Sequence, residues 1–435
     1  MIESIKDQYI KQLENDEIGW NGHASEAFYA RKKQAIADFK LLDLPTIKDE
    51  EWKYTNLSKL FKQLTPKTEN RKFTKDLQLS KDFGDVHLVV LENGQLNTSL
   101  SDHTLGDKVF IGSLKNSWTK FRDLYNTYFA KSENILNHAL YTLNTASDID
   151  GVFISISDGV ILDKPLHILH LTNEEVKENI VQVRHLTILG KNAQACIIET
   201  FHDSNAGLHC YNYGHEIFVD EYAILDNYKL QNLGAHSSLV DSTMLKQERG
   251  SVANIYTFSN GGGLIRNDLN VQLNDQHIES NIYGLSCGAK KNHIDHHTLM
   301  DHKYANCLSN ELYKGIYKDY SRGVFNGKVY VRKDAQKTNA FQSNQNLLLS
   351  DNARVDTKPQ LEIFADDVKC THGATVGQLE DDSVFYMQSR GLDKEIAKGI
   401  LSYAFASEVV EKVKHKAVNA FLRRQVLDFL ELDLD

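Results

Sequence analysis

The chain has 435 residues, of which 41% are hydrophobic and 25% are charged, and its formal net charge is −10. This composition is typical of a soluble globular protein with two or three structural units. The acidic balance argues against nucleic acid as a general partner, because a phosphate-binding surface needs concentrated positive charge. The charged start MIESIKDQYIKQLENDE and the lack of a long apolar run predict a cytoplasmic protein that does not bind a membrane.

Residues 1–149 predict an N-terminal helical and mixed region. Phe28, Ala35, Ile36 and Phe39 recur at helical spacing, and the segment 117–146 also has a helical pattern. Between these helices, VHLVVL and KVFIG are short apolar runs typical of strands. We expect Trp52, just after the first helical region, to be a packing anchor.

Residues 150–385 predict a β-rich core. Runs of four to seven strand-forming residues are separated by Gly, Asn and Asp turns, and no long helical pattern interrupts them. Such a series is compatible with a sandwich, a propeller or a β-solenoid, and periodicity alone does not decide between them.

A dense histidine cluster lies in HIDHHTLMDH. Strand alternation places His293, Asp295 and His297 on one face, where Asp301 could join them, and such a set can bind zinc or iron. The helical HExxH spacing is missing, so the residue types favour hydrogen-bonding roles, with His296 a secondary metal candidate.

A second candidate site lies in ADDVKCTHGATVGQ. Cys370 and His372 are two residues apart, so a strand would point both side chains to one face, as two ligands of a metal would require. The same face carries Val368, Ala374 and Val376, which favours a buried core histidine instead. Gly373 could introduce a bulge that redirects its neighbours.

The five cysteines do not form a recognisable framework. Their number is odd and no CxxC pair occurs, which argues against both a disulfide scaffold and a zinc knuckle.

Residues 386–435 predict a C-terminal helical region. An apolar stripe in GLDKEIAKGILSYAFASEVVEKV could pack on the β-core or bind a partner.

Several enzyme classes lack their motifs. The sequence has no GxxxxGK[ST] and no GxSxG, so we expect no nucleotide bound by this chain and no hydrolase triad. The aspartate pairs at 366–367 and 381–382 could belong to a β-helix polysaccharide-active enzyme, but adjacent aspartates in turns are usually solvated and no sugar-binding groove is evident.

A long C-terminal passage gives a more specific indication. SRGVFNGKVYV from Ser321, QSNQNLLLSDNA from Gln342, TKPQLEIFADDVKCTHGATVGQ from Thr357 and FYMQSRGL from Phe385 resemble the SufB/SufD family of iron–sulfur cluster assembly proteins. EEWKYTN from Glu50 resembles the opening segment of the SufD branch. SufB-type scaffolds usually carry a cysteine-rich motif before the β-core, and here the first cysteine is Cys196, which also favours the SufD branch.

The resemblance implies a right-handed parallel β-helix core flanked by helical segments. It also implies a non-catalytic subunit of a complex with SufB and the SufC ATPase, in which His372, and with less weight Cys370, would serve a transient nascent iron–sulfur cluster shared with SufB. The C-terminal helices would dock SufC through Leu392, Ile396, Ile400, Leu401 and Phe405. A purely structural adaptor without metal ligation is the alternative, and the sequence leaves open whether the isolated chain forms a homodimer. The sequence leaves flavin binding, the cluster type and the route of sulfur open.

Overall fold

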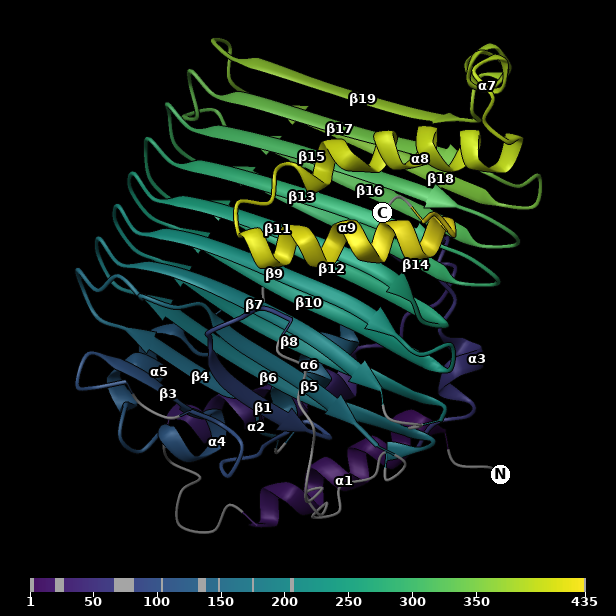
Figure 1. The fold of residues 1–435 in the computed structure, drawn as a ribbon. Helices are drawn as coiled ribbons and strands as arrows, with labels where there is room; N and C mark the ends of the chain where they lie inside the picture. Colours follow the sequence, from purple (N-terminus) through teal and green to yellow (C-terminus); the bar gives the residue numbers. More distant parts are fainter. Residues whose placement is uncertain are drawn as a thin grey trace.

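The computed structural model is a parallel β-solenoid with helices at both ends of the chain (Figure 1). It describes residues 4–19, 27–65, 82–102, 105–131, 138–147, 149–173, 176–203 and 207–433. The sixteen strands from β4 to β19 form eight coils of two strands each, which confirms the mainly β fold and selects the solenoid among the three expected architectures.

Each coil contributes one strand to each of two sheets. The ten-stranded sheet contains β1 (His87–Glu92), β2 (Gln95–Leu96), β5 (Leu166–Thr172), β7 (Gln194–Asp203), β9 (Ile224–Leu233), β11 (Val252–Gly261), β13 (Glu279–Gly288), β15 (Leu308–Tyr317), β17 (Asn339–Leu348) and β19 (Lys369–Gly377). The nine-stranded sheet contains β3 (Val109–Ser113), β4 (Val152–Ile156), β6 (Asn179–Leu189), β8 (His209–Val219), β10 (Ser237–Gln247), β12 (Leu264–Leu273), β14 (His293–His302), β16 (Arg322–Val331) and β18 (Arg354–Ile363). All pairings except β1–β2 and β3–β4 are parallel.

Strand alternation sends every second side chain into the space between the sheets. Because equivalent positions pair in register from coil to coil, inward side chains form rows along the solenoid. The main apolar cluster fills this interior and includes Val183, Leu225 and Ile282. Other inward rows are polar, as the buried Lys229, Asp241 and Asn267 show.

The N-terminal helices cover the outer face of the nine-stranded sheet over its first coils. They are α1 (Ile5–Gly19), α2 (Ala27–Leu41), α3 (Ser58–Phe61), α4 (Leu114–Ser117), α5 (Arg122–Tyr128) and α6 (Ala139–Ala146), with the 3-10 turn η1 (Glu50–Trp52). Their buried aromatic and aliphatic residues pack on outward side chains of β6, β8 and β10. The segment 117–146, which was expected to be helical, contains two helices, because α5 ends at Tyr128 and α6 begins at Ala139.

The C-terminal helices α8 (Lys394–Val410) and α9 (Lys416–Leu430) lie across the outer face of the ten-stranded sheet (Figure 1). Ala406, Val409 and Val410 pack there against outward residues of β9, β11, β13 and β15. The short helix α7 (Asp381–Ser389) stands beyond the last coil. Across the ranges given above, no helix is long and apolar enough to cross a membrane.

The solenoid ends without a cap at its C-terminal coil. Within the described chain, β18 and β19 are edge strands, each paired with another strand on one side only. Most of β19 is exposed and nearly all of β18 is half-buried, whereas the same strands one coil earlier are largely buried. The last coil therefore offers free backbone N–H and C=O groups.

Candidate functional site

His372 lies on this last strand, in the middle of β19, and is exposed. Its position pairs in register with Gln342 of β17, which is a buried inward residue. The expected alternation is therefore correct, but the preferred interpretation of a buried core histidine is wrong. No ninth coil covers this face among the described residues, so an inward position becomes an accessible one.

Cys370 shares the face of His372 but differs in environment. It pairs with the buried Ala340 and packs partly against the main interior cluster. Burial raises the pKa of its thiol, which keeps the sulfur protonated near neutral pH. Gly373 introduces no bulge, because β17 and β19 stay in continuous register from Lys369 to Gly377.

Two further polar residues continue the inward row of His372 into the solenoid. Gln342 occupies the row on β17 and Glu311 occupies it on β15. The amide Nε2 of Gln342 donates to Oε2 of Glu311 at 2.7 Å. The next two positions down the row are Ile282 and Ile255, so two apolar residues separate this polar stretch from Asn227 of β9.

The histidine cluster of β14 is a hydrogen-bonded structure. His293, Asp295 and His297 share the outer face as expected, and His297 lies between the carboxylates of Asp295 and Glu51 at 3.1 and 3.3 Å. His296 points inward instead, where its Nε2 lies 3.0 Å from the Ser286 hydroxyl and burial lowers its pKa to about 4. The contact between His297 and Glu51 ties the 3-10 turn to the sheet.

Asp295 also belongs to an ion-pair network under Trp52. Arg266 donates to both Asp268 and Asp295, and its guanidinium lies 4.2 Å from the centre of the Trp52 ring. Burial would raise the pKa of these two carboxyls, but Arg266 outweighs that effect and holds both below their ordinary value. Trp52 is thus the packing anchor that the sequence predicts.

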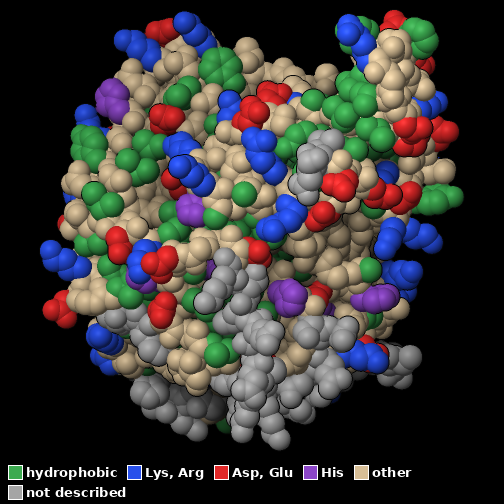
Figure 2. All heavy atoms as spheres, in the orientation of Figure 1, with side chains coloured by type: hydrophobic (Ala, Val, Ile, Leu, Met, Phe, Trp, Pro, Cys, Tyr) green, Lys and Arg blue, Asp and Glu red, His purple; other side chains and the backbone are tan. Residues whose placement is uncertain are grey.

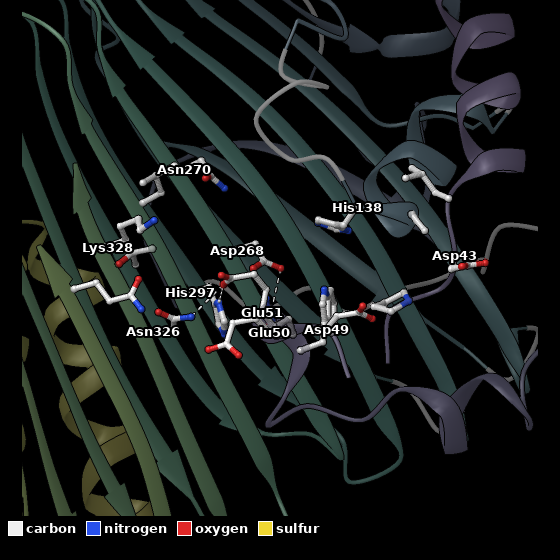
Figure 3. Close-up of a pocket in the computed structure, with 18 residues that line it drawn as sticks. Asp43, Asp49, Glu50, Glu51, His138, Asp268, Asn270, His297, Asn326 and Lys328 are labelled. Atoms are coloured by element: carbon white, nitrogen blue, oxygen red, sulfur yellow. Dashed lines mark hydrogen bonds and ion pairs between the residues drawn. The ribbon is translucent and has the colours of Figure 1, made fainter. Parts of the chain in front are cut away.

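A groove of about 620 Å³ opens between this turn and the nine-stranded sheet. Figure 3 shows Asp268, His297 and Asn326 facing Glu50 and Glu51 across it. Several of its charged groups have ion-pair partners: Arg266 pairs with Asp268 and His297 with Glu51 inside the groove, and Lys328 pairs with Glu362 outside it.

A buried group of possible metal ligands lies in the early coils. His170, His185 and Glu199 bring three ligand atoms within 4.8 Å of one another. The backbone N–H of Val152 donates to Nδ1 of His185, so the neutral ring carries its proton on Nε2, which faces Glu199 at 3.5 Å. Burial would raise the pKa of Glu199, but hydrogen bonds from His170 and His185 hold it well below its usual range. The three residues form a hydrogen-bonded core network, because a proton occupies the nitrogen that a metal would need.

The residues on and just before α8 that are expected to contact a partner differ in their exposure to solvent. Ile396 is 45% exposed, whereas Leu392, Ile400 and Leu401 are half-buried. Phe405 packs against the outer sheet face, and the Lys314 ammonium lies 4.3 Å from the centre of its ring. Phe385 and Tyr386 of α7 and Ile396 of α8 are exposed, and hydrophobic side chains gather over α7 and the adjoining part of α8 (Figure 2).

The sequence interpretation missed Glu311 and Gln342. A signal existed, since both precede His372 at intervals of about one coil, but the length of a coil was known only once the strands were paired. It also missed the network of His170, His185 and Glu199, whose members lie on three separate strands.

Fold and site together define the class: a two-sheet parallel β-solenoid with helical ends and an accessible imidazole on its terminal strand. Comparison with known proteins then gives the family. The "SUF system FeS cluster assembly, SufBD core domain" matches residues 170–405, and the "SufBD protein N-terminal region" matches residues 3–168. The chain therefore belongs to the SufBD family of iron–sulfur cluster assembly proteins.

Individual relatives agree with this assignment. The iron–sulfur cluster assembly protein SufD of Escherichia coli is 33% identical over 88% of this chain and 88% of its own length. An iron–sulfur cluster assembly SufBD family protein of Synechocystis is 31% identical over 92% of this chain and 91% of its own. A chloroplastic protein of Arabidopsis thaliana, ABCI7, is 26% identical over 98% of this chain and 92% of its own. The chain is a SufD homologue.

Proposed function

We propose that this chain is the SufD-type subunit of a complex with SufB and the SufC ATPase. In this complex His372 contributes an imidazole to a nascent iron–sulfur cluster at the SufB interface. The observation that carries the proposal is the exposure of His372 on the uncapped strand β19. A neutral imidazole is a common iron ligand, and a site shared between two subunits can release its cluster when the subunits separate.

The last coil has the properties of a protein interface. Its edge strands leave backbone groups unpaired, and apolar side chains are exposed around them, including Val376 at 44% and Phe364 at 56%. A SufB solenoid could pair with these edges, and a second copy of this chain would take the same place when SufB is missing.

This interface can be tested by co-expression with SufB. Val376→Asp should weaken the association with SufB at least tenfold, because it places a charge at the edge of β19. Tyr222→Asp changes an exposed aromatic residue in an earlier coil and serves as the matched control. Equal SufB affinity of both variants would contradict the proposed interface.

The SufC ATPase would dock on α8, with Ile396, Ile400 and Leu401 at the contact. Nucleotide-driven closure of SufC would then move the C-terminal helices and open the SufB interface around His372. Lys314 would connect α8 to the last coils. Its ammonium donates to the Phe405 carbonyl oxygen of α8 at 3.1 Å, and its own strand, β15, also carries Glu311. The chain itself would perform no catalysis.

An adaptor that positions SufB and SufC without binding metal is the competing function. It is favoured by the packing of Cys370 against the interior cluster, which turns the nearest possible second ligand away from the open end. His372→Ala separates the two functions. The adaptor predicts normal cluster yield from an intact complex, whereas the ligand proposal predicts that the yield collapses.

A further inference from the structure

The two residues beneath His372 have buried oxygen atoms that the fold does not use. Glu311 is 4% exposed and Gln342 is 3% exposed, and both lie in the inward row that ends at His372. Within the described parts of the chain, Oε1 of Glu311 and Oε1 of Gln342 have no hydrogen-bond partner of normal geometry. Buried polar atoms are nearly always paired, so two such oxygens on adjacent side chains need an explanation.

Glu311 differs from several other buried carboxylates of the solenoid. The buried Glu216, Asp241 and Asp295 each lie against an arginine or a lysine. No cationic side chain among the described residues forms an ion pair with Glu311, whose polar neighbours are the neutral Gln342 amide and the Thr298 hydroxyl. A buried carboxylate without a cation is costly, so it either takes up a proton or is neutralised by a cation from outside.

The opposite sheet makes room for this pair. A side chain at Gly327 of β16 would place its Cβ 2.5 Å from Nε2 of Gln342, so only glycine leaves the Gln342 amide in its position. Gln342 lies on the strand next to that of His372, and the backbones of neighbouring strands are about 4.8 Å apart. The row therefore offers a carboxylate, an amide carbonyl and an imidazole in sequence from the interior to the open end.

We propose that Glu311 and Gln342 form an inner binding position for a divalent cation, directly beneath His372. The donor set suits Fe²⁺, because carboxylate and carbonyl oxygens and imidazole are all ligands for such divalent ions. Iron is here a substrate of cluster assembly, held by oxygen ligands before the imidazole and the partner subunit take it over. This inference rests on the proposed role of His372 and extends it by two residues.

The test measures Co²⁺ binding to the full-length chain by its visible absorption, with Fe²⁺ titrated anaerobically in parallel. Glu311→Gln removes the charge but keeps the size of the side chain, and it should lower Co²⁺ affinity at least tenfold. Glu362→Gln, a half-exposed carboxylate on the outer face of β18, is the matched control and should bind as the wild type does. The swapped variant Glu311→Gln/Gln342→Glu keeps one carboxylate in the row and should stay within about threefold of the wild type.

Unchanged Co²⁺ affinity of a folded Glu311→Gln variant would overturn the inference, as would a wild-type chain that binds no Co²⁺. If Glu311→Gln does not fold, the swapped variant decides, since loss of binding there contradicts the site. Normal affinity in Glu311→Gln together with a collapsed cluster yield in His372→Ala would reject the inner position and leave the proposed function intact. Lost affinity in Glu311→Gln with normal yield in His372→Ala would support the inner position and reject the proposed function.

Discussion

Arg266 is the residue whose removal should most clearly destabilise the attachment of the N-terminal segment. Its side chain is 2% exposed, makes hydrogen bonds to Asp268 and Asp295, and donates to the backbone carbonyl of Glu51 at 2.7 Å. Arg266→Met keeps much of the volume and the contact with Trp52 but leaves both carboxylates buried without their cation. Breaking a buried pair in this way costs about 3–5 kcal/mol of unfolding free energy.

Urea unfolding at pH 7 measures this cost, and Arg322→Met is the matched control. Arg322 forms a similar pair with Asp356, but both side chains are about one-third exposed, so its loss should cost at most about 1 kcal/mol. The difference in unfolding free energy between the two variants therefore measures the effect of burying the ion pair, beyond the effect of removing a charge.

The pH dependence provides a second check on the reasoning. In the wild type, the lowered pKa values of Asp268 and Asp295 mean that their stabilisation is present above the ordinary pKa of 3.8 and is lost below it. In Arg266→Met the two carboxyls protonate readily, so its deficit should shrink as the pH falls from 7 towards 4. A cost below about 1 kcal/mol at pH 7, or a deficit that grows in acid, would refute the argument.

Three other substitutions test separate parts of the structure. Leu401→Asp should abolish SufC binding in a pull-down while the β-core stays folded, with Ala420→Asp on the exposed side of α9 as control; retained SufC binding would count against docking on α8. Burial lowers the pKa of His302 to about 4 from 6.5, so its stabilising effect is present above pH 6.5 and declines towards pH 4. His302→Gln should reduce the loss of unfolding free energy between pH 6.5 and pH 4 by about 3 kcal/mol. The same loss in the variant and the wild type would contradict the lowered pKa of His302. Gly327→Ala should lower the unfolding free energy by about 1–3 kcal/mol because its Cβ meets the Gln342 amide and the Phe325 ring, and a neutral effect would show that the interior can yield there.

The β-rich core could be predicted because its strands alternate apolar and polar residues between clear turn signals. The solenoid could not be derived from that pattern, since strand length and alternation are the same in a sandwich; only the family resemblance gave it. What distinguishes a solenoid is the register between strands about one coil apart, as between Glu311 and Gln342, and that register is a tertiary property.

His372 shows the same limit at the level of a site. Its alternation with Cys370 correctly predicted a shared face, and the apolar neighbours then favoured burial. The sequence could not show that this inward face belongs to the last coil, where no further strand covers it. The histidines of β14 illustrate the opposite case, because their local alternation was sufficient to identify a hydrogen-bonded face.

The central claim is that His372 is a ligand for a nascent cluster, and anaerobic reconstitution of the co-expressed complex with SufB and SufC tests it most directly. Wild type, His372→Ala and the neighbouring exposed control Thr371→Ala are compared for iron and sulfide content, with complex integrity checked by size exclusion. We expect the yield to collapse in His372→Ala while the complex survives and Thr371→Ala remains normal. An unchanged yield in His372→Ala would contradict the claim and leave this chain as a structural partner of SufB and SufC.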